Sequence, residues 1–253
     1  MRTAVAGGTG VVGRHVVAAL KAAGDEPVVL ARSTGINLVS GTGLDRPLEG
    51  VDAVIDVSNV ATLSRSRAVA FFEAATGQLL AAGERAGVRH HVVLSIIGVD
   101  RVDSGYYDGK RRQEQLALDG PVPATVLRAT QFHEFADQLL ARIRGPVVAV
   151  PRMRVQPVAA REVAEELVRL ARGPAVGQAP ELAGPEELEL VGMARLVARV
   201  RDGRRLVVPL PVPGRVGRAM AGGALLPTGP GPRGRQGFAE WLTTDGAQAP
   251  QTI

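Results

Sequence analysis

Three side chains between residues 95 and 110 have the types and spacing needed to reduce a carbonyl group. Ser95 ends an apolar run typical of a strand, and the four-residue spacing of Tyr106 and Lys110 places both on one helix face. After hydride adds to a carbonyl carbon, a tyrosine can protonate the alkoxide, and a neighbouring lysine lowers the tyrosine pKa. Serine can hydrogen-bond the carbonyl oxygen, and lysine can also hold a nicotinamide ribose. Ser95, Tyr106 and Lys110 are therefore the predicted catalytic residues.

The tyrosine assignment has alternatives. Tyr106 adjoins a second tyrosine, so it could be a packing aromatic at the start of a helix, and one YxxxK match arises easily by chance. If Tyr106 points away from the site, Ser95, a water molecule, a substrate phenol or His133 could carry the proton. His133 lies in QFHEF, where packing at a helix start is the alternative role.

The N-terminal sequence predicts a dinucleotide site, which hydride chemistry requires. In RTAVAGGTGVVG a short apolar strand stops at Gly7, and a helix is expected over Val11–Ala23. Gly7 permits a tight turn, Gly10 lets the backbone approach a pyrophosphate, and Gly13 lets the helix pack on the strand. The helix N-terminus then offers N–H groups to the phosphates. The predicted contacts are Gly7, Thr9, Gly10, Val11, Val12 and Gly13.

The end of the second strand favours NADP(H) over NAD(H). An NAD-binding fold carries an acidic residue there for the ribose 2′-hydroxyl. Here Arg32 and Ser33 follow the strand, and the next acidic residue is Asp45. A guanidinium and a hydroxyl suit a 2′-phosphate, although Arg32 could also be a solvated strand-end cation. Ser58 and Asn59, after the fourth strand, are expected on the ribose side of the cofactor; a turn-initiating role is the alternative for Asn59.

Composition narrows the function classes. The 253 residues include no cysteine, so disulfides and thiol nucleophiles are excluded. The four histidines are scattered, so no metal site is expected. The net charge of +5 is spread along the chain and aromatic residues are only 3%, which argues against nucleic-acid binding. No signal segment or membrane span is visible. We expect a cytoplasmic monomer or homodimer that acts on small molecules.

Strand and helix patterns alternate over residues 1–145, which predicts an α/β fold with a Rossmann-type, doubly wound parallel sheet. A small C-terminal substrate lobe is expected mostly over residues 146–253. Val207–Arg235, rich in Pro and Gly, reads as irregular structure. The expected core strands are Thr3–Ala6, Pro27–Ala31, Ile36–Val39, Ala53–Val57, His91–Ser95 and Ala124–Arg128. Helices are expected over Arg67–Ala86, Gly109–Leu118, Arg161–Ala171, Glu186–Val200 and Phe238–Leu242, and lobe strands over Pro146–Pro151 and Val155–Ala159.

The ordered motifs GGTGVVGR, SIIGVDR, YY..K, LRATQFHEF, VQPVAAREVAEEL and FAEWL resemble the atypical short-chain dehydrogenase/reductases of the NmrA-like group. The resemblance covers nearly the whole chain. It implies strand order 3-2-1-4-5-6, a substrate lobe, and nicotinamide contacts from Ala129, Thr130, Gln131 and Phe132. Two features depart from relatives: no acidic residue follows Val39, and Ser95 and Tyr106 are unusually close in sequence.

The resemblance implies an NADPH-dependent oxidoreductase of secondary metabolism, such as antibiotic biosynthesis. The apolar lobe favours a bulky apolar carbonyl compound, either an aromatic polyketide-type ketone or a quinone. The alternatives are a non-catalytic NADP(H) sensor and an NAD(P)-dependent isomerase or epimerase. The catalytic residues at 95, 106 and 110 favour an enzyme over a sensor.

Overall fold

The core of the protein is a six-stranded parallel sheet in the order β2-β1-β3-β4-β5-β8. This computed structural model describes residues 1–201, 203 and 205–244. The central strands are buried apolar runs, as expected for a sheet covered on both faces. The strands are β1 (Arg2–Ala6), β2 (Glu26–Leu30), β3 (Ala53–Asp56), β4 (His90–Ile96), β5 (Ala124–Ala129) and β8 (Gly177–Gln178).

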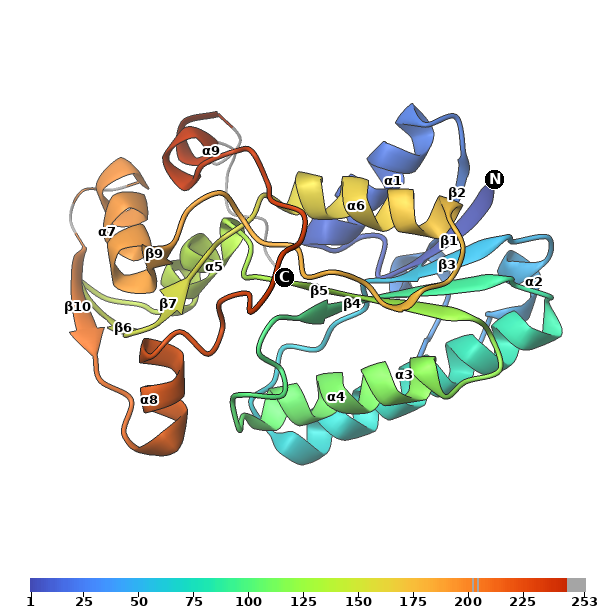
Figure 1. The fold of residues 1–253 in the computed structure, drawn as a ribbon, viewed down its shortest axis with the longest axis horizontal. Helices are drawn as coiled ribbons and strands as arrows, with labels where there is room; N and C mark the ends of the chain where they lie inside the picture. Colours follow the sequence, from blue (N-terminus) through green and yellow to red (C-terminus); the bar gives the residue numbers. More distant parts are fainter. Residues whose placement is uncertain (202, 204, 245–253) are drawn as a thin grey trace.

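Helices cover both faces of the sheet (Figure 1). On one face lie α1 (Val11–Ala22) and α6 (Ala160–Arg172), and on the other lie α3 (Arg65–Arg85) and α4 (Gly105–Leu118). The short α2 (Asp45–Leu48) precedes β3. The predicted fold class is confirmed. Helix α6 and strand β8 belong to the core although they come after residue 146. The chain therefore passes from the core into the lobe, returns to the core at α6 and β8, and then enters the lobe a second time.

The lobe lies beyond the carboxyl ends of the core strands (Figure 1). It has its own apolar cluster, in which Trp241, Phe238 and Leu190 are buried. Two small sheets frame it, a parallel pair of β6 with β10 and an antiparallel pair of β7 with β9. The lobe elements are α5 (Glu134–Arg142), β6 (Val147–Pro151), β7 (Arg154–Val155), β9 (Leu188–Glu189), α7 (Leu190–Arg201), β10 (Leu206–Leu210), α8 (Gly214–Ala221) and α9 (Phe238–Thr244).

The predicted strand Ile36–Val39 is wrong, so the sheet lacks the outer strand of the 3-2-1-4-5-6 order. Within this segment only Asn37 makes a β-bridge, to Thr42. Glycines 35, 41 and 43 all have φ values near +80°, a conformation that reverses the chain. The Asn37 side chain also accepts hydrogen bonds from the Val39 and Ser40 N–H groups. Turn chemistry therefore overrides the apolar pattern.

Other boundary errors lie in the lobe. Val207–Arg235 contains most of β10 and all of α8, so it is not wholly irregular. Of the predicted strand Val155–Ala159 only Val155 belongs to a strand, and α7 begins at Leu190 rather than at Glu186. Helix α5 was not predicted. These are short elements whose ends depend on contacts within the lobe, which local patterns do not reveal.

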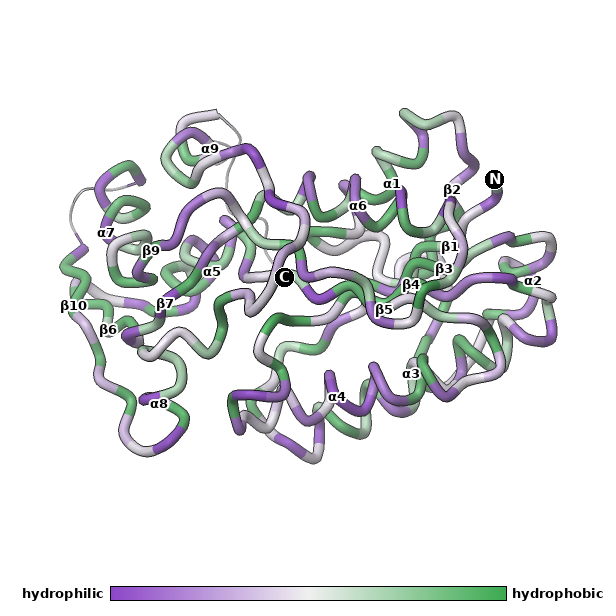
Figure 2. Tube along the Cα trace, viewed as in Figure 1, coloured by the Kyte–Doolittle hydropathy of each residue, from purple (hydrophilic) through white to green (hydrophobic). Residues whose placement is uncertain are grey.

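The core strands and α4 differ in the hydropathy of their residues. Figure 2 shows hydrophobic residues along the strands and many hydrophilic residues along α4. Within the described ranges, no helix is both long and apolar enough to cross a membrane. The same residues contain no group of three or more His, Asp or Glu side chains arranged to hold a metal ion.

Candidate active site

The glycine turn after β1 is shaped by close backbone contacts. Gly7 has a φ of 78°, and a Cβ there would lie 2.9 Å from the Val57 carbonyl oxygen. A Cβ on Gly13 would lie 2.1 Å from the Gly7 carbonyl oxygen, so any side chain would separate α1 from the turn. Gly10 is the N-cap of α1 and, with Thr9, is exposed. The turn thus presents backbone N–H groups at a helix N-terminus, the arrangement that binds phosphates.

Buried polar atoms without partners mark the carboxyl ends of β3, β4 and β5. The hydroxyls of Ser58 and Ser95 and both polar atoms of the Gln131 amide have no hydrogen-bond partner within the described part of the chain. Leaving such groups unpaired is costly, so a ligand is expected to satisfy them. Parallel strands end together at one sheet edge, where doubly wound folds bind nucleotides. This edge, with the glycine turn, fits a nicotinamide dinucleotide.

The loop after β5 is fixed by contacts to the returning chain. The Thr130 hydroxyl donates to the Gln156 carbonyl at 2.6 Å, and Phe132 packs against the core cluster. The Gln131 carbonyl accepts from the Val158 N–H. Ala129 ends β5 and is buried. Gln131 is therefore the member of this predicted cofactor loop whose side chain still lacks a partner among the described residues.

Tyr106 and Asn59 are joined directly. The Tyr106 hydroxyl donates to Asn59 Oδ1 at 2.7 Å, and this bond links the start of α4 to the loop after β3. Burial, with a smaller contribution from neighbouring Tyr107, raises the pKa of Tyr106 well above its usual value. The predicted lowering by a nearby lysine is therefore wrong. The phenol stays protonated at neutral pH, which suits a proton donor.

Lys110 faces the sheet rather than Tyr106. Its side chain is buried, and Nζ donates to the Leu94 carbonyl at 2.6 Å and to Gln113 Oε1. The ammonium group also lies 4.7 Å from the centre of the Phe72 ring. Burial lowers the pKa of Lys110 to about 8, with Asp56 and Glu114 opposing the shift. The helical spacing of Tyr106 and Lys110 is as predicted, but their polar atoms bind different partners.

His133 lies inside the lobe. Its ring is fully buried, with its centre 5.6 Å from the ring centres of both Phe238 and Trp241. Its Nε2 is 3.0 Å from the Gln236 carbonyl oxygen. These contacts describe packing immediately before α5, where the ring joins the cofactor loop to the C-terminal part of the lobe.

Arg32 and Ser33 follow β2 on the exposed surface. Among the described residues, no partner forms a hydrogen bond or ion pair with the Arg32 side chain. No acidic residue lies between β2 and Asp45. This cation is therefore available to an anionic group at the outer end of the nucleotide edge.

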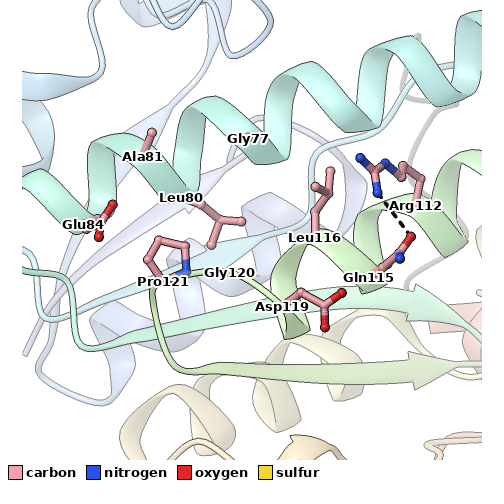
Figure 3. A pocket seen from close by; sticks show the side chains of 10 residues that line it. All are labelled: Gly77, Leu80, Ala81, Glu84, Arg112, Gln115, Leu116, Asp119, Gly120 and Pro121. Atoms are coloured by element: carbon pink, nitrogen blue, oxygen red, sulfur yellow. Dashed lines mark hydrogen bonds between the residues drawn. The ribbon is translucent and has the colours of Figure 1, made fainter.

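A groove between α3 and α4 lies at the opposite edge of the core. It is lined by Leu80, Leu116 and Pro121, with Glu84 and Asp119 at its rim (Figure 3). Asp119 and Pro121 are at the end of α4 and in the loop before β5, so the groove is near the amino end of that strand. It is separate from the polar atoms at the carboxyl ends and does not form part of the nucleotide site.

Comparison with known proteins agrees with this geometry. No protein-family model matches the chain. The chain is 32% identical over 214 residues to the (4-alkanoyl-5-oxo-2,5-dihydrofuran-3-yl)methyl phosphate reductase of Streptomyces griseus, covering 78% of this chain and 72% of the relative. A short-chain dehydrogenase/reductase superfamily protein from Agrobacterium tumefaciens with bound NAD has the same fold, with a TM-score of 0.71. The chain belongs to the short-chain dehydrogenase/reductase superfamily.

Solved structures of other short-chain dehydrogenase/reductases share the fold at low sequence identity. The Agrobacterium protein is 20% identical and covers 96% of this chain and 95% of its own. The UDP-N-acetylglucosamine 4-epimerase from Bacillus cereus is 18% identical, with a TM-score of 0.70 and coverage of 98% of both chains. RMD from Pseudomonas aeruginosa, complexed with NADPH, is 17% identical, with a TM-score of 0.65 and coverage of 83% and 86%. Both NAD and NADPH thus occur among proteins of this fold.

Sequence reasoning missed two residues in this short-chain dehydrogenase/reductase. Asp56 is fully buried at the end of β3 and accepts hydrogen bonds from Gln113 Nε2 at 2.8 Å and from the Ser58 N–H at 2.9 Å. Gln113 is also fully buried, one helical turn from Lys110. Two sequence features could have revealed these residues. Asp56 is an acidic residue at the end of an apolar strand, and Gln113 lies three positions after Lys110.

Proposed function

We propose that this short-chain dehydrogenase/reductase is an NADPH-dependent reductase that reduces a carbonyl group of a substrate with a bulky apolar body. We further infer that it belongs to the atypical, NmrA-like group, because the motif series that suggested this group extends through the lobe. The observation that carries the function is the buried Ser95 hydroxyl at the carboxyl end of β4, which has no hydrogen-bond partner among the described residues. The reductase relative from Streptomyces griseus supports the same reaction class.

The preference for NADPH rests on the end of β2. There Arg32 is exposed and the following loop contains no carboxylate. A guanidinium forms strong charge-assisted hydrogen bonds to phosphate, whereas NAD carries only a hydroxyl at that position. Gly7 to Gly13 would hold the pyrophosphate, and Ser58, Asn59 and Gln131 would contact the ribose and nicotinamide side. When bound, the cofactor supplies the hydride.

The chain's own residues supply the proton and the orientation. Ser95 donates a hydrogen bond to the carbonyl oxygen of the substrate. As negative charge develops on that oxygen, Tyr106 gives up its phenolic proton to it, and the product is an alcohol. The high pKa of Tyr106 keeps this proton in place until charge develops. For this to happen the Tyr106 hydroxyl must leave Asn59, which is exposed and can rotate away.

The lobe favours an apolar substrate. Its apolar core is covered in part by apolar residues that are only partly buried, in and just after α8: Val216, Met220 and Ala224. The relative from Streptomyces griseus acts on a ring that bears an alkanoyl chain and a phosphate ester. Arg152, Arg215 and Arg218 are exposed on this lobe and could meet an anionic substituent. An apolar carbonyl compound, with or without a phosphate, is therefore the proposed substrate class.

The test is oxidation of NADPH by the purified protein, followed by its absorbance. The substrates would be a quinone, a polycyclic aromatic ketone, and an alkanoyl dihydrofuranone with and without a phosphate ester. NADH would be assayed in parallel. Turnover faster with NADPH than with NADH supports the proposal, whereas tight NADPH binding without turnover of any compound refutes the reductase function.

A further inference from the structure

Helix α4 is hydrophilic (Figure 2), yet several of its polar side chains are buried. Lys110 is 4% exposed, Gln113 is 0% exposed and Glu114 is 6% exposed. Gln113 and Glu114 both lie one turn after Lys110, and the side chains of all three bond to residues at the ends of β3, β4 and β5. Burial of three such residues is unfavourable unless each is paired. Their partners show what this face does.

The pairs form one continuous chain of hydrogen bonds. Lys110 Nζ donates to the Leu94 carbonyl at 2.6 Å and to Gln113 Oε1. Gln113 Nε2 donates to Asp56 Oδ2 at 2.8 Å. The other Asp56 oxygen, Oδ1, accepts from the Ser58 N–H at 2.9 Å. The chain therefore begins at the residue before Ser95 and ends at the backbone of Ser58.

Two partners within the protein already engage the ammonium group of Lys110. An ammonium group has three donors. Two are used by Leu94 and Gln113, and the group lies 4.7 Å from the centre of the Phe72 ring, which attracts a cation. Glu114, one turn further along, binds Arg128 at the end of β5 with two hydrogen bonds. The ends of β3, β4 and β5 are thus all held by α4.

We propose that Lys110, Gln113 and Asp56 are positioning residues that fix the backbone at Ser58 and Ser95 in the geometry that binds the dinucleotide. Lys110 acts through this hydrogen-bond chain. The inference rests on the proposed function only in taking the dinucleotide to be NADPH. It differs from the expectation drawn from the YxxxK spacing, which makes the lysine a catalytic and ribose-binding residue.

A double-mutant cycle tests the proposal. Lys110→Met, Gln113→Leu and the double variant would be titrated with NADPH by calorimetry. We expect each single substitution to weaken binding roughly tenfold and the double variant to be no weaker than the worse single one, because both break one chain. If Gln113→Leu binds like the wild type while Lys110→Met does not, Lys110 contacts the cofactor itself. That result, additive losses, or no loss in either variant would overturn the proposal.

A matched control lies on the same helix. Arg112 is partly exposed and bonds to Glu73 and Gln115 outside the chain of hydrogen bonds. Arg112→Gln should bind NADPH as the wild type does. Thermal unfolding of each variant would show whether it is folded at the temperature of the titration.

A second measurement covers the case in which Lys110→Met fails to fold. Gln113→Asn keeps the amide but is one methylene too short to reach both partners. In the protein without added cofactor, its amide hydrogen exchange should be faster around Ser58 and Ser95 and unchanged around Gly7 to Gly13. Unchanged exchange at the two serines would overturn the proposal. Absence of reductase turnover in the wild type would refute the proposed function, while the exchange comparison would still decide the positioning role.

Discussion

The two ends of the nucleotide edge are built differently. At β3 and β4, Ser58 and Ser95 are held by a buried chain of hydrogen bonds that runs through Asp56, Gln113 and Lys110. At β2, Arg32 and Ser33 are exposed. In the first region, the fold fixes the positions of the two serines. In the second region, the positively charged Arg32 side chain is exposed and can change its conformation.

This difference separates two requirements of the reaction. The reacting atoms must meet within a fraction of an ångström, which a rigid, preorganised shell provides. Discrimination between a phosphate and a hydroxyl needs only a cation near the right place. Substitutions in the buried region should therefore affect the rate and the fold, whereas substitutions at β2 should affect the choice of cofactor.

The largest effect is expected at the turn that both regions share. Gly13→Ala would place its Cβ against the Gly7 carbonyl, so α1 must move away from the turn. We expect a loss of more than about 2 kcal/mol of folding stability and no detectable NADPH binding. Gly77→Ala is the control, because a Cβ on Gly77 in α3 meets nothing within 4 Å. It should increase helix stability by up to about 1 kcal/mol. Chemical denaturation and calorimetry would measure both, and near-normal binding by Gly13→Ala would contradict the assignment of this turn.

Tyr106→Phe tests whether the buried region carries the proton donor. Removal of an essential general acid should lower kcat by about 10²- to 10⁴-fold, with little change in NADPH affinity. Tyr107→Phe is the matched control, since Tyr107 packs against the lobe cluster and burial raises its pKa to about 12. Steady-state kinetics with the best substrate would distinguish the two variants. A loss of less than about tenfold for Tyr106→Phe would point to another proton source.

Arg32→Ala tests the exposed region. Loss of a charge-assisted hydrogen bond to phosphate should weaken NADPH binding by about 10- to 100-fold and change NADH binding little. Arg46→Ala, in the exposed part of α2, removes a similar cation away from the strand end and should leave both affinities unchanged. Calorimetric titration with the two cofactors gives the ratio. Equal losses for NADPH and NADH would exclude a 2′-phosphate contact.

The last prediction concerns pH and the buried lysine. Burial lowers the folded-state pKa of Lys110 to about 8 from 10.5. Between these values the unfolded chain binds a proton that the folded chain lacks, so folding stability should rise with pH. Asp56 and Glu114 are the charged groups that act on this lysine, and Lys110→Met removes only the lysine. The difference in unfolding free energy between wild type and Lys110→Met should grow in favour of the wild type above pH about 8. A difference that is constant with pH would show that the lysine is not desolvated as described.

The sequence predicted the parts of the fold that depend on local patterns. Glycine spacing and apolar runs located the turn at Gly7, helix α1 and five of the six core strands, because these features depend on local backbone geometry and burial. The strand expected at Ile36–Val39 failed because glycines and the Asn37 side chain form turns there. The two-residue strand β8 is too short to leave a pattern.

The site was predictable in its residue types but not in its connections. Helical spacing correctly placed Tyr106 and Lys110 one turn apart on α4. It could not show that Tyr106 bonds to Asn59 and that Lys110 bonds to the Leu94 carbonyl, since these partners come from a loop and a strand distant in sequence. Asp56 and Gln113 gained their roles only when β3 and α4 were brought together. Contacts between distant segments are set by tertiary packing, which one sequence does not display.

The stacked rings in the lobe give the protein an internal optical reporter. Trp241 is the chain's single tryptophan, and it is buried against both Phe238 and His133. His133 directly follows the loop that contains Gln131, and its ring contacts the indole of Trp241. The indole is therefore linked to the nucleotide edge through the side chain of His133. Its fluorescence, uncomplicated by any second indole, should respond when a ligand at Gln131 alters this loop. Ligand binding could therefore be timed in stopped-flow experiments without attaching a dye.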